Sequence, residues 1–317
     1  MKKTHHSIKM FKSWYSFIFK FLGVFVFCMV LFFIFRPEGE LIFSQGVLHH
    51  QDAENLRVKV LTWNVLRGND EFFNVNSWYK RKRAFQTILE QRDYDIICFQ
   101  EALFTQISFF QEVLAGYDYI GVGRGDGLSK GEHTPIFYRR DRFDLVDSKT
   151  FWLSPTPDVP SRGWGEFVPR ICTWVELKDK ASQQHFRVYN THLQLSPYAQ
   201  FSAARMLAQR LRVSKIPAVL LGDLNMPAQW PAFRSLKDAG LQSVDTKGAL
   251  TYHIYGKGIR CLDHILYSKN WYVLNGGLIK QKVDDRYPSD HWGLWAELTL
   301  KKYHPSLLFL LKFHRGF

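Results

Sequence analysis

The chain of 317 residues has few cysteines and none of the common zinc-binding patterns. Its cysteines stand far apart, so no Cys-x-x-Cys pair is present, and no His-Glu-x-x-His segment occurs. These absences exclude the usual zinc sites. One disulfide would suit an extracytoplasmic domain, but three buried thiols are the default expectation for Cys98, Cys172 and Cys261.

Acidic residues are absent from both ends of the chain. Residues 1–36 contain six Lys or Arg and residues 301–317 contain four, with no Asp or Glu in either segment. These ten carry most of the net charge of +13, because residues 37–300 have 32 basic residues against 29 acidic ones. A protein that follows a nucleic-acid backbone usually has a larger excess. The basic ends therefore favour a membrane surface.

An apolar run covers residues 17–35, where Lys20 is the single charged side chain. As a helix it would span about 28 Å, close to the hydrocarbon thickness of a bilayer. The basic residues 1–16 predict a cytoplasmic N-terminus and an extracytoplasmic remainder. Residues 36–40 lack a cleavage pattern. We therefore predict a retained transmembrane anchor, with a cleaved signal and secretion, or a buried helix, as alternatives.

The C-terminal tail, residues 301–317, is apolar with cationic flanks and too short to span a membrane. Packing on its own domain is the simpler interpretation. A second membrane contact is the alternative.

The rest of the pattern predicts one α/β domain at residues 56–300, after a linker at residues 36–55. Helical spacing occurs at 77–91, 105–114 and 202–213. Strand-like runs occur at 56–63, 95–99, 117–122, 134–138, 143–153, 171–177, 186–190, 219–221, 262–267 and 292–300. This series predicts two sheets packed face to face, with helices outside. The glycines between Gly121 and Gly127 suggest a phosphate loop, but a strand follows them, so a hairpin loop is expected.

Polar residues stand at the ends of several of these apolar runs. An Asn or Asp after a strand is usually a turn residue, but so many in one domain indicate a shared site. Carboxylate and amide oxygens suit a hard divalent cation, so Glu101, Asn64 and Asp290 are candidate ligands of Mg²⁺ or Mn²⁺. The complete set is Asn64, Glu101, Asn190, His192, Asp223, Asn225, Asp263, Asp290 and His291.

These residue types permit metal-assisted hydrolysis of a phosphate ester. The metal would polarise a phosphoryl oxygen. His291 could take a proton from the attacking water, and Asp263 could orient its imidazole. Asp223 and Asn225 would position the water or the leaving oxygen.

Other polar residues could bind the phosphate itself. His192 and Asn190 would donate hydrogen bonds to it. Arg170, which precedes a predicted strand, could add a fork of donors or be a surface cation. Tryptophans in proline-rich loops could line the cleft or simply pack, namely Trp152, Trp164 and Trp230.

Over residues 56–300 the chain resembles the endonuclease/exonuclease/phosphatase superfamily, and within it uncharacterised bacterial, membrane-anchored members. The resemblance rests on Trp63-Asn64, Gln100-Glu101, Asn190-Thr191-His192, Gly222-Asp223-Leu224-Asn225, Leu262-Asp263 and Ser289-Asp290-His291. It implies a four-layer α/β sandwich and Mg²⁺-dependent cleavage of phosphate esters. It also implies a metal on Glu101 with Asn64 and Asp290, and a His291–Asp263 dyad.

The superfamily acts on nucleic acids, phospholipids and inositol phosphates, and the fold does not choose among them. We expect a phosphodiesterase, with nuclease activity slightly favoured. A sphingomyelinase-type lipid phosphodiesterase and an inositol-phosphate phosphatase are the alternatives. A catalytically inactive binding protein is a lesser alternative. No obligate protein partner is expected.

Overall fold

The computed structural model describes residues 41–44, 56–68, 76–246, 248–254 and 256–300. The predicted anchor at residues 17–35 and the tail at residues 301–317 lie outside them. Among the described residues, no helix is long and apolar enough to cross a membrane. The anchor and the extracytoplasmic location therefore stay predictions.

The first sheet has seven strands in the order β1-β14-β15-β2-β3-β5-β4. β2 and β3 are parallel, and the other neighbours are antiparallel. Residues 41–44, expected in a linker, instead form β1 and pair with β14. The strands are β1 (Leu41–Ser44), β2 (Leu56–Asn64), β3 (Ile96–Gln100), β4 (Tyr117–Ile120), β5 (Ile136–Arg139), β14 (Trp271–Ile279) and β15 (Gly293–Leu300).

The second sheet has six strands in the order β10-β13-β9-β8-β7-β6. Here β8 and β9 are parallel and their neighbours are antiparallel. A short hairpin, β11 (Tyr252–Ile254) with β12 (Lys257–Arg260), stands apart. The six strands are β6 (Phe143–Trp152), β7 (Ile171–Asp179), β8 (His185–His192), β9 (Ala218–Asp223), β10 (Leu241–Ser243) and β13 (Asp263–Ser268).

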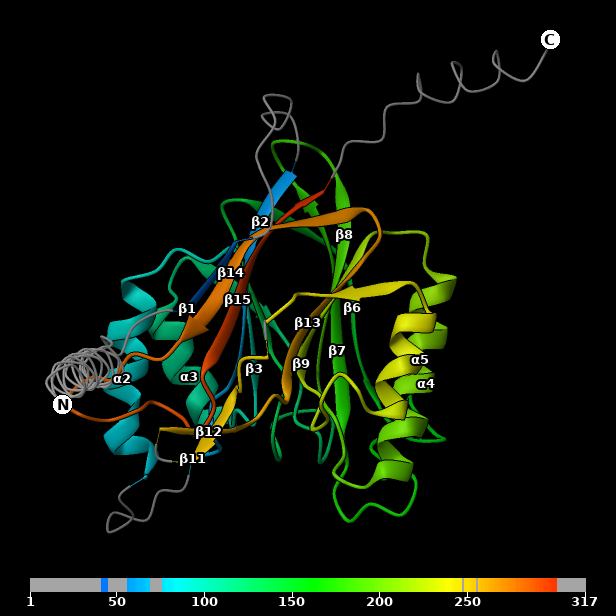
Figure 1. Ribbon diagram of the computed structural model, residues 1–317, viewed down its shortest axis with the longest axis horizontal. Helices are drawn as coiled ribbons and strands as arrows, with labels where there is room; N and C mark the ends of the chain where they lie inside the picture. Colours follow the sequence, from blue (N-terminus) through cyan, green and yellow to red (C-terminus); the bar gives the residue numbers. More distant parts are fainter. Residues whose placement is uncertain (1–40, 45–55, 69–75, 247, 255, 301–317) are drawn as a thin grey trace, which may run out of the picture. The chain divides into compact units, whose positions relative to one another are not determined.

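Two helices cover the outer face of each sheet (Figure 1). α2 (Trp78–Glu90) and α3 (Phe104–Val113) pack on the first sheet, and α4 (Pro197–Val213) and α5 (Pro231–Asp238) pack on the second. α4 begins earlier than residue 202, the predicted start. The Ser196 hydroxyl caps its first turn by accepting from the Ala199 amide, and Pro197 suits the first helical position. α5 and β14 were not predicted.

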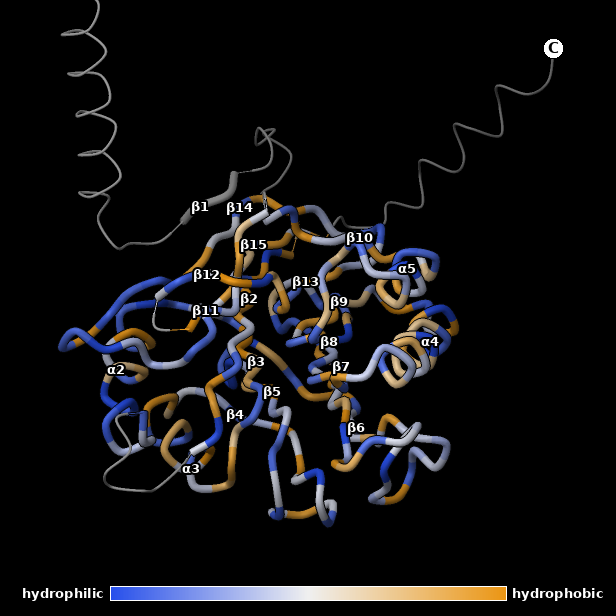
Figure 2. The backbone as a smooth tube through the Cα atoms, turned by 60° about the horizontal axis from the view of Figure 1, so that its bottom comes forward, coloured by the Kyte–Doolittle hydropathy of each residue, from blue (hydrophilic) through white to orange (hydrophobic). Residues whose placement is uncertain are grey.

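Three apolar clusters hold these layers together. Val58 and Ile96 of the first sheet meet Val188 and Val219 of the second in the central cluster. Separate clusters join α2 and α3 to the first sheet, and α4 and α5 to the second. Hydrophobic stretches follow the strands, whereas many loops are hydrophilic (Figure 2). The layers therefore run helix, sheet, sheet, helix, as the predicted α/β sandwich requires.

The two parallel strand pairs bring distant segments to one edge of the sandwich. The carboxyl ends of β2 and β3 lie side by side, with Asn64 opposite Gln100. The ends of β8 and β9 do the same, with His192 opposite Asp223. β13 starts at this edge, where Asp263 pairs with Asp223. The glycine-rich segment joins the antiparallel strands β4 and β5, so the predicted hairpin loop is confirmed.

Candidate active site

A carboxylate–imidazole–carboxylate arrangement lies at this edge. The Nδ1 atom of His291 is 2.7 Å from Oδ2 of Asp263, and its Nε2 atom is 3.7 Å from Oδ2 of Asp223. All three residues are buried. The first distance is that of a strong hydrogen bond, whereas the second is too long for one. Asp263 therefore fixes the ring so that Nε2 faces Asp223.

Charge and burial couple the protonation of His291 to that of Asp223. Burial opposes a charge on His291, but Asp263 and Asp223 outweigh it and raise the pKa of the imidazole to about 10. Burial raises the pKa of Asp223 to about 7. The two groups therefore act as one acid–base unit, in which a carboxylate poised near neutral pH stands beside an imidazole that holds its proton.

The backbone next to Asp223 fixes the orientation of its carboxylate. The Asn225 amide donates to Oδ1 of Asp223 at 2.9 Å, and the Asn225 side chain donates to the Leu193 carbonyl at 2.9 Å. Asn225 adopts a left-handed backbone, with φ of 52°. Such a conformation is uncommon outside glycine but tolerated by asparagine. Asn225 thus positions Asp223 in this structure.

The predicted metal ligands also meet at the edge. The Asn64 amide nitrogen lies 3.0 Å from Oε1 of Glu101 and 3.0 Å from Oδ2 of Asp223. Glu101 has a left-handed φ of 62°, and strained backbone of this kind concentrates at functional sites. Burial raises the pKa of Asp290, and the nearby negative charge of Glu101 adds to the effect. Two carboxylates that repel one another fit a divalent cation, and Asn64 could contribute its amide oxygen, which here accepts from the Leu66 amide at 3.0 Å.

A second acidic group at this edge fits a metal less well. Ligand atoms of Asp223, Asp263 and His291 all lie within 4.8 Å of one another. The Asp263 carboxylate is already engaged with His291 at 2.7 Å. A hard cation also prefers oxygen ligands and water to imidazole. We therefore favour Glu101, Asn64 and Asp290 as the metal ligands and the other three as the acid–base group.

His192 and Arg170 lie beside these residues. Nε2 of His192 is 3.5 Å from Oδ2 of Asp223, and burial lowers the pKa of His192 well below its usual value. Arg170, predicted as a phosphate donor or a surface cation, is only 8% exposed. Its position in a small cavity with Glu101 and His192 rules out the surface interpretation.

Asn190 has a different environment from the one expected of a phosphate donor. Its amide nitrogen donates to the Phe99 and Pro135 carbonyls, each at 2.8 Å, and its oxygen accepts from Gln100 at 2.7 Å. Both amide hydrogens are used, so none is left for substrate, which corrects the expectation. Asn190 instead ties β8 of the second sheet to β3 of the first.

Arg81 is a supporting residue that the sequence reasoning missed. It lies on α2, is 2% exposed, and donates from Nη1 to the carbonyls of Val65, at 2.8 Å, and Pro288, at 2.6 Å. These carbonyls lie in the loops that carry Asn64 and Asp290. A signal was available, because Arg81 falls on the same helical face as the predicted apolar residues of this segment.

The loop that carries Asp290 is held to β2 as well. Ser289 donates its hydroxyl to the Asn64 carbonyl at 2.6 Å, and the indole of Trp63 donates to the His291 carbonyl at 2.8 Å. These bonds join residues more than two hundred positions apart in sequence. The Ser-Asp-His segment is therefore positioned by the end of β2.

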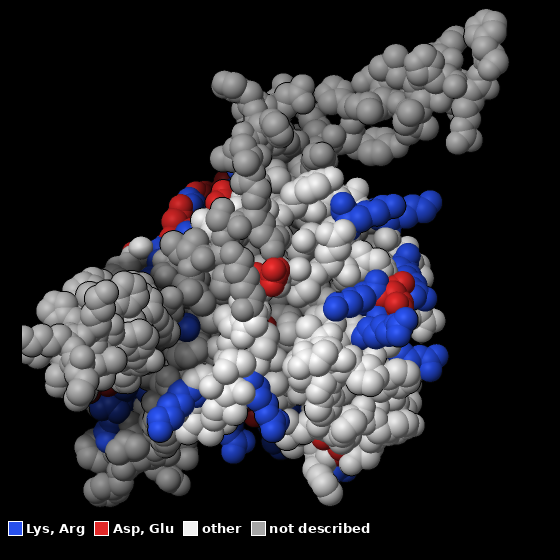
Figure 3. Space-filling model, viewed as in Figure 1, with Lys and Arg blue, Asp and Glu red and all other residues white. Residues whose placement is uncertain are grey.

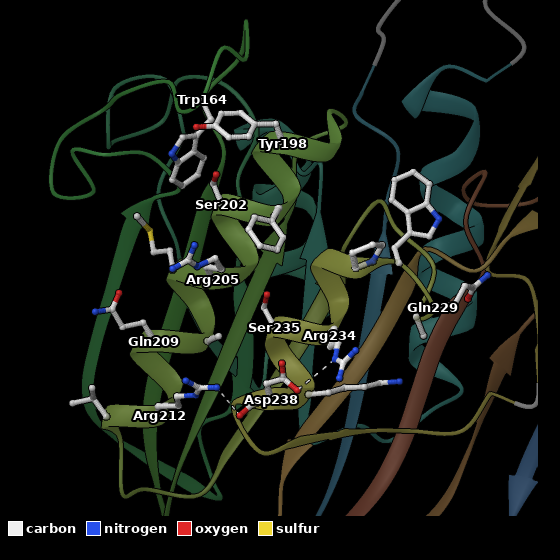
Figure 4. Close-up of a pocket in the computed structure, with 18 residues that line it drawn as sticks. Trp164, Tyr198, Ser202, Arg205, Gln209, Arg212, Gln229, Arg234, Ser235 and Asp238 are labelled. Atoms are coloured by element: carbon white, nitrogen blue, oxygen red, sulfur yellow. Dashed lines mark hydrogen bonds and ion pairs between the residues drawn. The ribbon is translucent and has the colours of Figure 1, made fainter.

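A larger groove, of about 1520 Å³, lies between α4 and α5 (Figure 4). Trp164 and Trp230 line this groove, and Trp152 is buried. Lys and Arg outnumber acidic side chains on this side of the molecule (Figure 3). None of the predicted site residues lines the groove. The groove is therefore separate from the candidate site.

Comparison with known proteins identifies the family. Residues 61–291 match the model of the Endonuclease/Exonuclease/phosphatase family. The chain belongs to this family. Its members are phosphate-ester hydrolases, and this chain is such an enzyme. The motifs that carried the resemblance all lie within or next to the matched residues.

Two solved structures and one sequence relative are similar to this chain. A member of the endonuclease/exonuclease/phosphatase family from Bacteroides thetaiotaomicron is 31% identical, with a TM-score of 0.72, over 78% of this chain and 99% of that one. A mannosyl-6-phosphatase from the same organism is 32% identical, with a TM-score of 0.70, over 76% and 99% of the two chains. An uncharacterised protein of Acanthamoeba polyphaga mimivirus is 32% identical over 53% of this chain and 67% of its own length.

Proposed function

We propose that this protein hydrolyses a phosphate ester with the help of a divalent cation, Mg²⁺ or Mn²⁺, held by Glu101, Asn64 and Asp290. The observation that carries the proposal is the contact network in which Asn64 joins Glu101 to Asp223 while His291 faces the same Asp223 oxygen. This network supports a cation bound beside the proposed acid–base residues. When bound, the cation would stabilise the negative charge that develops on the phosphoryl oxygens.

The protein's own residues would supply the proton transfers. Water attacks phosphorus, its oxygen forms the new bond, and the ester bond to the alcohol breaks. The Asp223–His291 pair takes the proton from the water, and that proton leaves with the alcohol oxygen. Asp263 keeps Nε2 of His291 directed at Asp223 throughout. His192 adds a neutral imidazole beside the phosphate.

These residues act on a phosphorus centre that monoesters and diesters share. The predicted preference for a diester, and for a nuclease in particular, therefore stays a prediction. The proposal is tested with full-length protein and Mg²⁺ on plasmid DNA, RNA, sphingomyelin vesicles, inositol phosphates and 4-nitrophenyl phosphate. Asp223→Asn and His291→Ala should each lower the rate on the accepted substrate by at least about a thousandfold. Retained activity in both variants would contradict the proposal.

A further inference from the structure

The glycine-rich hairpin between β4 and β5 lines a small cavity beside the candidate site, through Arg124, Glu132 and His133. It is tightly closed, because the Gly125 amide donates to the Lys130 carbonyl at 2.8 Å and the Arg124 amide donates to the Glu132 carbonyl at 3.0 Å. A Cβ atom at Gly123 would meet the Lys130 carbonyl oxygen at 2.5 Å. The glycines therefore permit a narrow hairpin, and its side chains rather than its amides face the site.

This hairpin is also fixed to its surroundings. The His133 amide donates to the carbonyl of Ala102, the residue after Glu101, at 2.8 Å. The Trp152 indole donates to the Arg124 carbonyl at 2.8 Å. Arg124 and Glu132 are thereby held next to the predicted metal ligand.

Glu132 organises a cluster of arginines. Arg124 binds both of its carboxylate oxygens, at 2.7 and 2.9 Å. Arg170 and Arg67 approach the same carboxylate at 4.0 and 3.9 Å. The side chains of Arg124, Arg170 and Glu132 are only 10–12% exposed. Arg124 and Arg170 together exceed Glu132 by one positive charge, and Arg67, whose side chain is 66% exposed, adds a further cation at the edge.

Some buried polar atoms at this cluster have no hydrogen-bond partner. Within the described residues, Nε and Nη1 of Arg170 and Nδ1 of His192 are buried and make no hydrogen bond. An unpaired buried polar group costs about 1–3 kcal/mol unless a ligand or water satisfies it. These atoms border a cavity of about 10 Å³ that Glu101 also lines. A space of this size holds about one oxygen atom.

We propose that the Arg124–Glu132–Arg170 cluster binds the terminal phosphoryl group of a phosphomonoester, with one non-bridging oxygen in this cavity, and thereby favours monoesters over diesters. The inference rests on the proposed function and names its substrate class. A monoester phosphate carries close to two negative charges near neutral pH, so the two buried guanidiniums attract it strongly. A diester carries only one negative charge, so it gains less from the same guanidinium donors.

The test compares two esters with the same leaving group on full-length protein with Mg²⁺. 4-Nitrophenyl phosphate is the monoester and bis(4-nitrophenyl) phosphate is the diester. The wild type should have the higher kcat/KM on the monoester. Arg170→Met should lower that value about tenfold to a hundredfold, as expected for loss of charge-assisted hydrogen bonds. Its effect on the diester should stay below about threefold.

Arg234→Met is the matched control, because the Arg234 side chain is 83% exposed on α5. It should change neither rate. Arg170→Lys keeps the charge but loses the fork, and should give an intermediate loss on the monoester. A wild-type preference for the diester, or equal losses on both esters in Arg170→Met, would overturn the inference while leaving the proposed function intact.

Calorimetric titration with inorganic phosphate separates the two claims further. Binding should be weakened at least tenfold by Arg170→Met or, if that variant does not fold, by Arg124→Lys. If neither these two esters nor the substrates used to test the proposed function are hydrolysed with any divalent metal, the proposed function fails. The phosphate titration then decides the inference alone, because absent binding, or equal binding by wild type and variants, contradicts it.

Discussion

Replacing Arg81 by methionine should destabilise the fold by about 3–5 kcal/mol, the cost of breaking a buried charged network. Its guanidinium donates four hydrogen bonds of 2.6–2.8 Å to main-chain carbonyls of Asn76, Val65, Leu66 and Pro288. A methionine side chain fills much of the space but satisfies none of these oxygens. The estimate is at least about a fifth of the stability of a typical domain.

Urea unfolding at pH 7 measures this loss as a lower midpoint with an unchanged slope. Arg83→Met is the matched control, since Arg83 lies two positions along the same helix with a side chain 79% exposed. Its ion pair with Asp284, at 3.8 Å, is exposed and should be worth less than about 1 kcal/mol. A loss below about 1 kcal/mol in Arg81→Met, or equal losses in the two variants, would refute the reasoning.

Three further predictions concern the strand ends and the effect of pH. Gly222→Ala should lower stability by at least about 2 kcal/mol in thermal unfolding. The reason is that a Cβ at this left-handed residue would stand 1.9 Å from the Thr191 carbonyl oxygen. A variant as stable as the wild type would contradict this prediction. Asp263→Asn should lower kcat about a hundredfold to ten-thousandfold. It should also lower the pKa of His291, measured by NMR titration. An unchanged pKa would count against the pairing of Asp263 with His291. Burial lowers the pKa of His253 from 6.5 to about 4. The free energy of unfolding should therefore fall as the pH is lowered from 6.5 to 4, because the unfolded chain binds more protons in this interval. His253→Gln should lose less stability over this interval than the wild type, and equal losses would contradict the prediction.

Local sequence patterns predicted the strand ends well. A polar residue at either end of an apolar run marks a sheet edge. Asn64, Glu101 and Asp223 were found because they follow such runs, and Asp290 because it precedes one. Their convergence follows from the parallel pairs β2–β3 and β8–β9. The layers were also predictable from local patterns, because apolar residues repeat with a different period in strands and in helices.

Features that depend on contacts between distant segments could not be predicted from local sequence patterns. Asn190 ends a strand like the other candidates, but the carbonyls that use its amide come from the other sheet. Arg124 and Glu132 gave no local signal, because only the folded hairpin brings them to Glu101 and Arg170. β1 was assigned to a linker because the partner that makes it a strand, β14, lies more than two hundred residues away.

The central claim is that a divalent cation on Glu101 drives hydrolysis of a phosphate ester. The most direct measurement follows hydrolysis of 4-nitrophenyl phosphate and plasmid DNA by chelator-treated full-length protein as Mg²⁺ is returned, for wild type and Glu101→Gln, with Mg²⁺ binding followed by calorimetry. We predict no activity without metal, recovery in the wild type, and weakened binding with at least a thousandfold lower rate in a folded Glu101→Gln protein. Hydrolysis without metal, or a Glu101→Gln variant that binds Mg²⁺ and reacts like the wild type, would contradict the account.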